Sequence, residues 1–282
     1  MNIRRIAVVG AGTMGSGIAQ VTAQSGFEVL LEDVTEEAVN SGLAKIGNRL
    51  EKMVGEGRLA PAEKERVLYN IKTSASLNDC AGADLVIEAA AENEAIKKGI
   101  FRELGRLCRR ETIFSSNTSA ISITRLGKST DRPAQFIGMH FMNPAHKMRL
   151  LEIVRGLDTS GETIGTITAV AEKMGKTPVV VNDSPGFVAS RLIMHAVNDA
   201  VFCLQEGVCS KEGIDTIMKL GGNHPMGPLE LADFIGLDIC LATLDLLHAE
   251  LGEKYRPCIM LRKMVEGGRL GRKSGEGFYA YN

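Results

Sequence analysis

The sequence contains 282 residues, of which 44% are hydrophobic, so the chain is long enough to fold into two domains with substantial cores. Its formal net charge of -1 gives no general electrostatic reason to expect binding to nucleic acid or to a membrane surface. Six cysteines occur without a C-x-x-C pair, a distribution that favours reduced thiols over a disulfide framework or a zinc site.

The pattern also lacks targeting signals. A hydrophobic strand begins almost at the N-terminus, so we expect no cleavable signal, and no apolar run approaches the roughly 20 residues that span a bilayer. These features predict a soluble, cytoplasmic protein that needs no metal.

The N-terminal segment predicts a dinucleotide-binding turn. The apolar strand from Ile6 to Val9 leads directly into Gly10, Gly12 and Gly15, which form the pattern G-x-G-x-x-G. Each glycine meets a separate requirement: a tight turn, close backbone approach to a pyrophosphate, and close packing of helix on strand. The segment from Thr13 to Gln24 is then the helix whose N-terminal amides face the phosphates.

An acidic residue after the second strand favours NAD as the cofactor. The strand from Phe27 to Leu31 is followed by Asp33, which lies 23 residues after Gly10. In this fold an acid at that position accepts hydrogen bonds from the adenosine ribose. The stretch from Leu31 to Ala38 has four acids and no Arg or Lys, so it would repel the 2′-phosphate of NADP. The alternative is an ordinary glycine turn, against which the register of strand, glycines, helix and acid argues.

The rest of the first 183 residues alternates helices and strands, as a parallel sheet requires. We expect helices over 35–54, 61–69, 93–107 and 162–174, and strands over 84–88, 112–115, 135–141, 149–154 and 178–181. The first two of these helices form an insertion into a minimal Rossmann unit. The strands over 135–141 and 149–154 are separated by a loop too short for a crossover helix, so they should pair antiparallel.

The composition changes at Ser184-Pro185-Gly186, after which helical periodicity dominates. The predicted fold class is therefore α/β: a Rossmann-like dinucleotide-binding domain with a helical hairpin insertion over 1–183, followed by an all-α C-terminal domain over 184–282. The segment from Phe187 to Gln205 is more apolar than one solvent-facing helix needs, which favours burial between the subunits of a homodimer. The glycine-rich tail over 271–279 is expected to dock as a loop.

A nicotinamide enzyme that oxidises an alcohol needs a base for the hydroxyl proton, and histidine is the default candidate. Among five histidines, His140 lies near the end of a predicted strand, where α/β folds collect their ligands. Glu152 lies on the next strand, so the hairpin would bring its carboxylate to the imidazole and fix the tautomer. The alternative is a structural histidine, which we assign to the other four.

A second polar cluster, Ser115 to Ser119, follows the strand over 112–115 at its carboxyl end. The hydroxyls and the Asn117 amide there are candidates for binding a substrate oxygen. The alternative is turn and cap chemistry, because Ser, Thr and Asn favour helix starts and residues 120–126 fit a short helix. The residues by themselves leave these two interpretations open.

Taken together, these motifs resemble the 3-hydroxyacyl-CoA dehydrogenase family, and most closely its short bacterial 3-hydroxybutyryl-CoA members. The resemblance spans essentially the whole chain. It is carried by Gly10-Ala11-Gly12-Thr13-Met14-Gly15, Val86-Ile87-Glu88-Ala89-Ala90-Ala91-Glu92-Asn93, Ser116-Asn117-Thr118-Ser119, His140-Phe141-Met142-Asn143-Pro144 and Asn223-His224-Pro225-Met226-Gly227-Pro228.

The resemblance implies roles for individual residues. His140 would be the catalytic base and Glu152 its partner, while the hydroxyl of Ser119, with Asn117 beside it, would contact substrate and nicotinamide. Lys273 in the tail would close over the dinucleotide. Cofactor contacts are implied at Gly10, Gly12, Thr13, Met14, Gly15, Asp33, Glu92, Lys97, Asn143 and Lys273.

One position departs from the family pattern: Ser190 precedes Arg191 where many members have an Asn that bonds the substrate. Its shorter hydroxyl still offers a donor, directly or through water, so Ser190 stays a candidate. For the CoA phosphates, the helical insertion offers Arg49 and Lys52, spaced to share one helical face. The alternative for these two cations is a solvated charged face.

The resulting prediction is reversible hydride transfer between NAD(H) and C3 of a short acyl-CoA, interconverting acetoacetyl-CoA and (S)-3-hydroxybutyryl-CoA. One alternative is a β-hydroxyacid dehydrogenase that acts on free acids, which the pairing of His140 with Glu152 disfavours. The other is a non-catalytic NAD-binding structural protein, because a fold does not fix a function.

Overall fold

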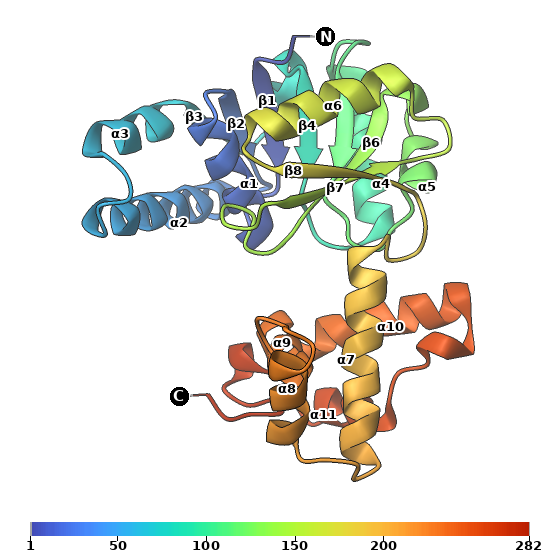
Figure 1. The fold of residues 1–282 in the computed structure, drawn as a ribbon. Coiled ribbons are helices and arrows are strands. Elements are labelled where there is room, and N and C mark those ends of the chain that lie inside the picture. Colours follow the sequence, from blue (N-terminus) through green and yellow to red (C-terminus); the bar gives the residue numbers. More distant parts are fainter. Residues whose placement is uncertain (1, 282) are drawn as a thin grey trace. The chain divides into compact units, whose positions relative to one another are not determined.

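The computed structural model describes residues 2–281. The chain divides into two compact units, one up to Asp183 and one from Ser184 onward (Figure 1). The first unit is an α/β domain and the second is helical, as the sequence predicts.

The first unit is built on one eight-stranded sheet with the order β3-β2-β1-β4-β5-β6-β7-β8. The six strands β1 to β6 run parallel, β7 pairs antiparallel with β6, and β8 runs parallel to β7. The strand bounds are β1 (Arg5–Val9), β2 (Glu28–Glu32), β3 (Ile71–Ser74), β4 (Leu85–Glu88), β5 (Ile113–Ser116), β6 (Phe136–Phe141), β7 (Leu150–Arg155) and β8 (Thr177–Asn182).

The predicted antiparallel pairing of the two strands around residue 145 is confirmed, but one strand was not predicted. Strand β3 follows the helical insertion and pairs with β2 at the edge of the sheet. Only Ile71 of its four residues is fully buried, so no hydrophobic run marks it in the sequence.

Helices connect the strands of this unit. They are α1 (Thr13–Gln24), α2 (Glu36–Gly55), α3 (Pro61–Tyr69), α4 (Glu94–Leu107), α5 (Ile123–Gly127) and α6 (Gly161–Lys173), with the 3-10 turns η1 (Leu77–Gly82) and η2 (Pro133–Gln135). Side-chain caps fix several starts: Thr35 accepts from the Ala38 amide at α2, Asn93 from Ile96 at α4, and Ser160 from Thr163 at α6. The helices therefore begin within a residue or two of their predicted starts, except the short α5.

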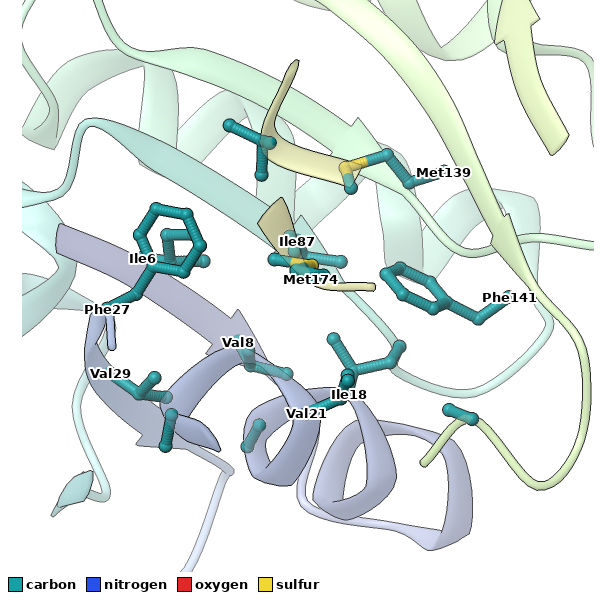
Figure 2. Close-up of a cluster of buried hydrophobic side chains, with 14 of the residues drawn as sticks. Ile6, Val8, Ile18, Val21, Phe27, Val29, Ile87, Met139, Phe141 and Met174 are labelled. Atoms are coloured by element: carbon teal, nitrogen blue, oxygen red, sulfur yellow. The ribbon is translucent and has the colours of Figure 1, made fainter. Parts of the chain in front are cut away.

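Apolar side chains fill both faces of the sheet. On one face, β1 and β6 contribute residues such as Val8 and Phe141 to a core that they share with Ile18 of α1 and Met174 at the end of α6 (Figure 2). On the other face, the ring of Phe101 of α4 packs edge to face on the ring of Phe136 of β6, with the two ring centroids 4.7 Å apart. Each such fully buried side chain contributes roughly 1.5–3 kcal/mol, so the sheet is a rigid platform for the loops at its edge.

The insertion α2–α3 extends beyond the β3 edge of the sheet (Figure 1). The first half of α2 lies against the glycine turn, because a Cβ on Gly42 would lie 2.7 Å from the Cβ of Ala11. A glycine at this point lets α2 pass directly beside the predicted dinucleotide-binding turn.

The second unit consists of helices packed around an apolar core. They are α7 (Ala189–Gln205), α8 (Lys211–Leu220), α9 (Pro228–Ile235), α10 (Leu237–Leu251) and α11 (Ile259–Glu266), with the short turns η3 (Glu253–Tyr255) and η4 (Arg272–Ser274). The predicted docking of the tail is confirmed: Asp233, 1% exposed, accepts the amide protons of Phe278 and Tyr279, both at 2.9 Å. This buried carboxylate fixes the end of the described chain to α9.

Residues 2–281 contain neither a candidate membrane span nor a candidate metal cluster. None of the helices described there is long and apolar enough to cross a membrane. Nor does this part of the chain bring together three or more His, Cys, Asp or Glu side chains that could hold a metal ion.

Candidate active site

The glycine turn has the geometry that binding a pyrophosphate requires. A Cβ on Gly10, where φ is +101°, would lie 2.6 Å from the Ala89 carbonyl oxygen, and one on Gly15 would lie 1.7 Å from that of Gly10. A Cβ on Gly12, in contrast, would meet no atom within 4 Å. Gly10 and Gly15 are therefore needed for packing, whereas Gly12 faces open space at the N-cap of α1, where helix amides attract anions.

Asp33 is anchored to this turn. Its Oδ2 accepts the Ala11 amide at 2.6 Å, and its Oδ1 accepts the Val34 amide at 2.8 Å. A carboxylate has about four acceptor positions, so two remain for ribose hydroxyls. The structure thus fixes Asp33 beside the glycine turn, and its contact with the ribose stays a prediction.

The neighbouring Glu32 is only 4% exposed, and burial raises the pKa of its carboxyl to about 7, with smaller effects from the charges of Asp33 and Glu103. Two adjacent carboxyls thus have different environments. Asp33 binds backbone amides at the turn, whereas Glu32 is desolvated and disfavours its charged form near neutral pH.

His140 and Glu152 lie directly opposite each other in the β6–β7 ladder. The Nδ1 atom of His140 is 2.7 Å from Oε2 of Glu152, and the two residues are 5% and 2% exposed. Because antiparallel partners point to the same face, the sheet register itself sets this distance. The predicted proximity of acid and imidazole is confirmed, and the carboxylate holds the ring with Nδ1 as the bonded nitrogen.

Asn117 connects the polar segment after β5 to the strand that carries His140. Its side-chain Oδ1 accepts the backbone amide of Phe141 at 2.9 Å, and its backbone amide donates to the Glu88 carbonyl at 2.8 Å. With Oδ1 committed as an acceptor, the side-chain NH₂ of Asn117 points away from that bond and is oriented as a donor. Asn117 is therefore bonded to the residue that directly follows His140, although it lies 24 positions before Phe141 in sequence.

Of the two interpretations of residues 115–119, turn chemistry is confirmed for Thr118, and binding of a substrate oxygen stays a prediction. Thr118 has the turn role, because its Oγ1 accepts the Ala120 and Ile121 amides at 3.3 and 2.9 Å. That turn delays the helix, so α5 begins at Ile123 instead of the predicted residue 120. Ser119 is half-buried beside it, and its backbone is held in place.

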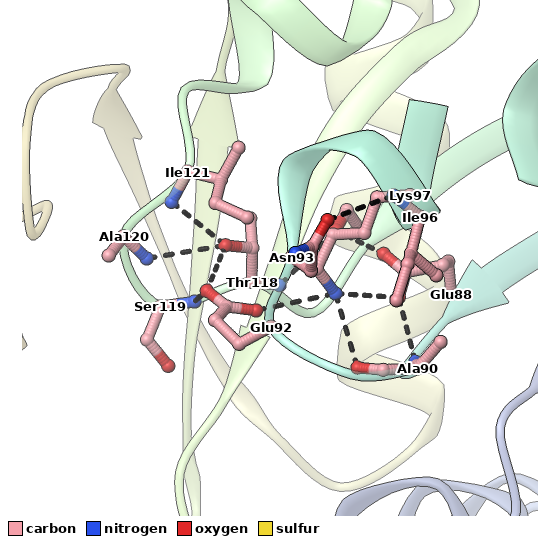
Figure 3. Close-up of polar contacts among 11 residues, drawn as sticks. Glu88, Ala90, Glu92, Asn93, Ile96, Lys97, Thr118, Ser119, Ala120 and Ile121 are labelled. Atoms are coloured by element: carbon pink, nitrogen blue, oxygen red, sulfur yellow. Dashed lines mark hydrogen bonds and ion pairs between the residues drawn. The ribbon is translucent and has the colours of Figure 1, made fainter. Parts of the chain in front are cut away.

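A charged cluster, with Glu88 and Lys97 buried and Glu92 exposed, contacts the segment that carries Ser119 (Figure 3). Lys97 Nζ lies 2.6 Å from Glu88 Oε1 and 3.3 Å from Glu92 Oε2. Glu92 accepts the Ser119 amide at 3.1 Å, and its contact with the Thr118 hydroxyl is 2.5 Å. The charges thus form a chain from the end of β4 to the loop that carries Ser119.

Glu88 is the innermost group of this cluster. It is 0% exposed and accepts from Lys97, from the Ser116 hydroxyl at 2.6 Å and from the Ala90 amide at 2.7 Å. Burial raises the pKa of Glu88, and these three donors oppose that shift. The sequence analysis gave Glu88 no site role, and the available signal was a glutamate at the end of an apolar strand. The Ser116 hydroxyl, one of the candidates for binding a substrate oxygen, instead donates to Glu88.

Two predicted cofactor residues have environments that differ from one another. Lys97 is 1% exposed and engaged with two glutamates, so the geometry gives it a supporting position. Asn143 is exposed on the loop that joins β6 to β7. A direct contact of either residue with the cofactor stays a prediction.

The two residues predicted to bind CoA phosphates differ in how exposed their side chains are. Arg49 turns toward α1, where its Nε donates to Gln20 Oε1 at 2.8 Å, and burial lowers the pKa of its guanidinium. Lys52 projects into solvent, with 76% of its side chain exposed. Arg49 also has a buried Nη2 for which the described residues provide no partner.

The remaining predicted residues belong to the second unit. Ser190 is half-buried in the first turn of α7. Lys273 pairs with both carboxylate oxygens of Asp238, at 2.5 and 2.6 Å, which joins η4 to the start of α10. Their predicted contacts with ligand stay predictions.

Comparison with known families assigns the chain. Residues 5–184 match the NAD binding domain of 3-hydroxyacyl-CoA dehydrogenase, and residues 186–281 match its C-terminal domain. The chain belongs to the 3-hydroxyacyl-CoA dehydrogenase family. NAD is therefore the cofactor of its first domain, and the protein is an NAD-dependent dehydrogenase.

Several relatives of this family are similar over their full length. The Deinococcus radiodurans protein named "Probable 3-hydroxybutyryl-CoA dehydrogenase" is 54% identical over 98% of this chain and 100% of its own. The 3-hydroxybutyryl-CoA dehydrogenase of Bradyrhizobium diazoefficiens is 47% identical over 99% of this chain and 96% of its own. The crystal structure of (S)-3-hydroxybutyryl-CoA dehydrogenase PaaH1 from Ralstonia eutropha is 45% identical, covers 100% of both chains and has a TM-score of 0.96.

Proposed function

We propose that the protein interconverts acetoacetyl-CoA and (S)-3-hydroxybutyryl-CoA with NAD(H), using His140 as general acid and base and Glu152 as its partner. The observation that carries the proposal is the buried contact of 2.7 Å between the imidazole and the carboxylate. Full-length relatives named as 3-hydroxybutyryl-CoA dehydrogenases support the choice of substrate.

In the oxidative direction, Nε2 of His140 takes the proton of the C3 hydroxyl as the C–H bond at C3 breaks. NAD⁺, when bound, supplies the hydride acceptor. Glu152 bonds Nδ1, so it fixes the tautomer and stabilises the imidazolium that forms. In the reductive direction the imidazolium returns the proton to the C3 oxygen, and the charges balance in both directions.

The C3 oxygen would be held by donors from the segment after β5. The NH₂ of Asn117 is oriented by the Phe141 amide, and the Ser119 backbone by Glu92. Such preoriented donors stabilise developing charge without reorganising. Ser190 would add a hydroxyl donor from the C-terminal domain.

Cofactor binding would use the glycine turn for the pyrophosphate and Asp33 for the ribose. Thr13 and Met14 would contribute the first amides of α1, and Asn143 and Lys273 would contact the dinucleotide from two loops. Lys97 would act through Glu92, since its ammonium is buried.

The CoA phosphates would bind the insertion at Arg49 and Lys52. The exposed Lys52 supports a contact with a solvent-facing phosphate, and the unpartnered Nη2 of Arg49 supports a ligand beside α2. An unchanged KM for acetoacetyl-CoA in the double variant Arg49→Ala, Lys52→Ala would contradict this part of the proposal.

The C-terminal domain over 184–282 would cover the substrate and form a homodimer, in a cytoplasmic enzyme. Leu192 of α7 supports this, because it is 63% exposed although α7 is rich in apolar residues. Light scattering on a size-exclusion column tests the dimer, and a monomer at micromolar concentration would contradict it.

The decisive experiment compares His140→Gln and Glu152→Gln with His248→Gln, a partly exposed histidine of the C-terminal domain, as the matched control. Because general acid–base catalysis contributes roughly 10²–10⁴-fold, kcat should fall by at least about 100-fold in His140→Gln and less in Glu152→Gln. The control should keep the wild-type rate. NADH binding, followed by fluorescence, verifies that each variant folds.

A folded, NADH-binding His140→Gln enzyme with near wild-type turnover would remove the assignment of His140. The same assay with free 3-hydroxybutyrate in place of the CoA thioester separates the proposed substrate from a free β-hydroxyacid. Comparable rates on both would favour the free-acid alternative.

A further inference from the structure

Lys176 is a buried lysine that lies between α6 and β8 and has no part in the proposed reaction. It is 8% exposed, and its ammonium donates to the carbonyl oxygens of Ala145 at 2.5 Å and Met148 at 2.8 Å. A buried ammonium that bonds two carbonyls of one loop is costly to desolvate, so the contact needs an explanation.

The backbone of Lys176 is fixed independently of these bonds. Gly175, with φ at +68°, ends α6, and the Lys176 amide donates to the Ala171 carbonyl at 3.0 Å, as in a Schellman cap. The next amide, that of Thr177, donates to the Arg149 carbonyl at 2.7 Å and starts the pairing of β8 with β7. The side chain therefore extends from a rigid base toward the loop.

The loop that Lys176 bonds is the β6–β7 loop (residues 142–149), which joins the strand of His140 to the strand of Glu152. It also carries Asn143. The loop packs on α1: a Cβ on Gly17 would lie 3.2 Å from the Cβ of Ala145 and 3.6 Å from its amide nitrogen. It thus covers the second turn of the helix whose first turn begins at the glycine turn.

Lys176 and α1 therefore hold the loop from two sides. On the α1 side a Cβ at Gly17 would press on the Cβ of Ala145 at 3.2 Å, and on the other side Lys176 binds two carbonyls three residues apart. The loop's internal bonds alone, from the Lys147 and Met148 amides to the Pro144 carbonyl, form one turn but do not attach it to the sheet.

We propose that Lys176 is a positioning residue that fixes the β6–β7 loop over the phosphate end of the cofactor site and thereby presents Asn143 to NAD(H). This rests on the proposed function, in which Asn143 contacts the cofactor. The His140–Glu152 pair lies on the strands and keeps its register without the loop. Lys176 thus governs cofactor affinity more than the rate of proton transfer.

Burial lowers the pKa of Lys176, because desolvation disfavours the charged ammonium. The two carbonyl oxygens that accept its hydrogen bonds favour the charged form and oppose this effect. A cation binds such carbonyls more strongly than a neutral donor does. Arginine, which keeps the charge and the donors in a planar group, should therefore replace Lys176 in part, and methionine, which keeps only length and packing, should not.

The experiment compares Lys176→Met and Lys176→Arg with Lys147→Met as the matched control. Lys147 is an exposed residue of the same loop, and its substitution removes the same charge. We expect Lys176→Met to raise the KM for NADH at least about fivefold, to leave kcat within about threefold, and to speed amide exchange at Lys147 and Met148. Lys176→Arg should lie between Lys176→Met and wild type, and the control should match wild type.

The proposal is wrong if folded Lys176→Met keeps the wild-type KM and exchange rates, or if Lys147→Met reproduces the shift in KM. Should Lys176→Met fail to fold, Gly17→Ala perturbs the loop from the α1 side, and a wild-type KM for NADH in that variant would equally overturn it. A wild-type enzyme without turnover on acetoacetyl-CoA would instead reject the proposed function, and the exchange rates would still report on Lys176.

Discussion

Removing the ammonium from the Glu88–Lys97–Glu92 cluster should destabilise the protein in a way that depends strongly on pH. Lys97→Met keeps the length and the packing of the side chain but removes the ion pair of 2.6 Å to Glu88. Glu88 is 0% exposed and keeps the Ser116 hydroxyl and the Ala90 amide as donors. Breaking a buried pair in this way leaves an uncompensated charge and typically costs about 3–5 kcal/mol.

Protonation of Glu88 limits this cost. An acid whose pKa is raised in the folded state destabilises the protein above its ordinary pKa, here 4.5, and the penalty disappears as the pH falls toward that value. At about 1.36 kcal/mol for each pH unit, keeping the carboxyl protonated at pH 7 costs about 3.4 kcal/mol. At pH 5 the same protonation costs about 0.7 kcal/mol.

Urea unfolding followed by circular dichroism at pH 7 and pH 5 measures both values. The matched control is Lys98→Met. Lys98 is the next residue along α4 and forms a partly exposed ion pair with Glu94, so its loss should cost no more than about 0.5 kcal/mol of stability at either pH. The double variant Lys97→Met, Glu88→Gln should recover most of the lost stability at pH 7. An equal loss at both pH values, or an equal loss in the control, would refute the reasoning.

Two further predictions test the residues around the cofactor turn. Glu32→Gln should stabilise the protein by about 1–3 kcal/mol at pH 8, because burial raises the pKa of Glu32 to about 7 and disfavours its charged form above that pH, and the gain should vanish near pH 4.5, as urea unfolding would reveal. Gly15→Ala should fail to fold normally, because its Cβ would lie 1.7 Å from the Gly10 oxygen, whereas Gly12→Ala should unfold at the wild-type temperature yet bind NADH more weakly. Normal NADH binding by Gly12→Ala in a fluorescence titration would argue against a pyrophosphate at that turn.

The sequence predicted the architecture of the sheet because local signals agreed with the fold. Apolar strands alternating with capped helices indicated the parallel part, and the short loop after residue 141 required an antiparallel β7. That pairing was enough to bring Glu152 to His140 without any knowledge of side-chain positions.

Other features were not readable because they depend on contacts distant in sequence. Strand β3 has one fully buried residue, and only its pairing with β2 makes it a strand. The burial of Lys97 follows from its partner Glu88 on another element, and the bonds of Lys176 link residues 28 and 31 positions apart. Helix α5 starts late because the Thr118 turn competes with it.

The placement of His140 and Glu152 on facing strands has a consequence for how such a protein can change. Side chains alternate between the two faces of a strand, so inserting or deleting one residue within β6 or β7 would turn one member of the pair to the opposite face. Changes in even steps, or confined to the connecting segment, preserve their meeting. The meeting of the acid and its imidazole thus depends on strand parity, which a single inserted or deleted residue in either strand would break.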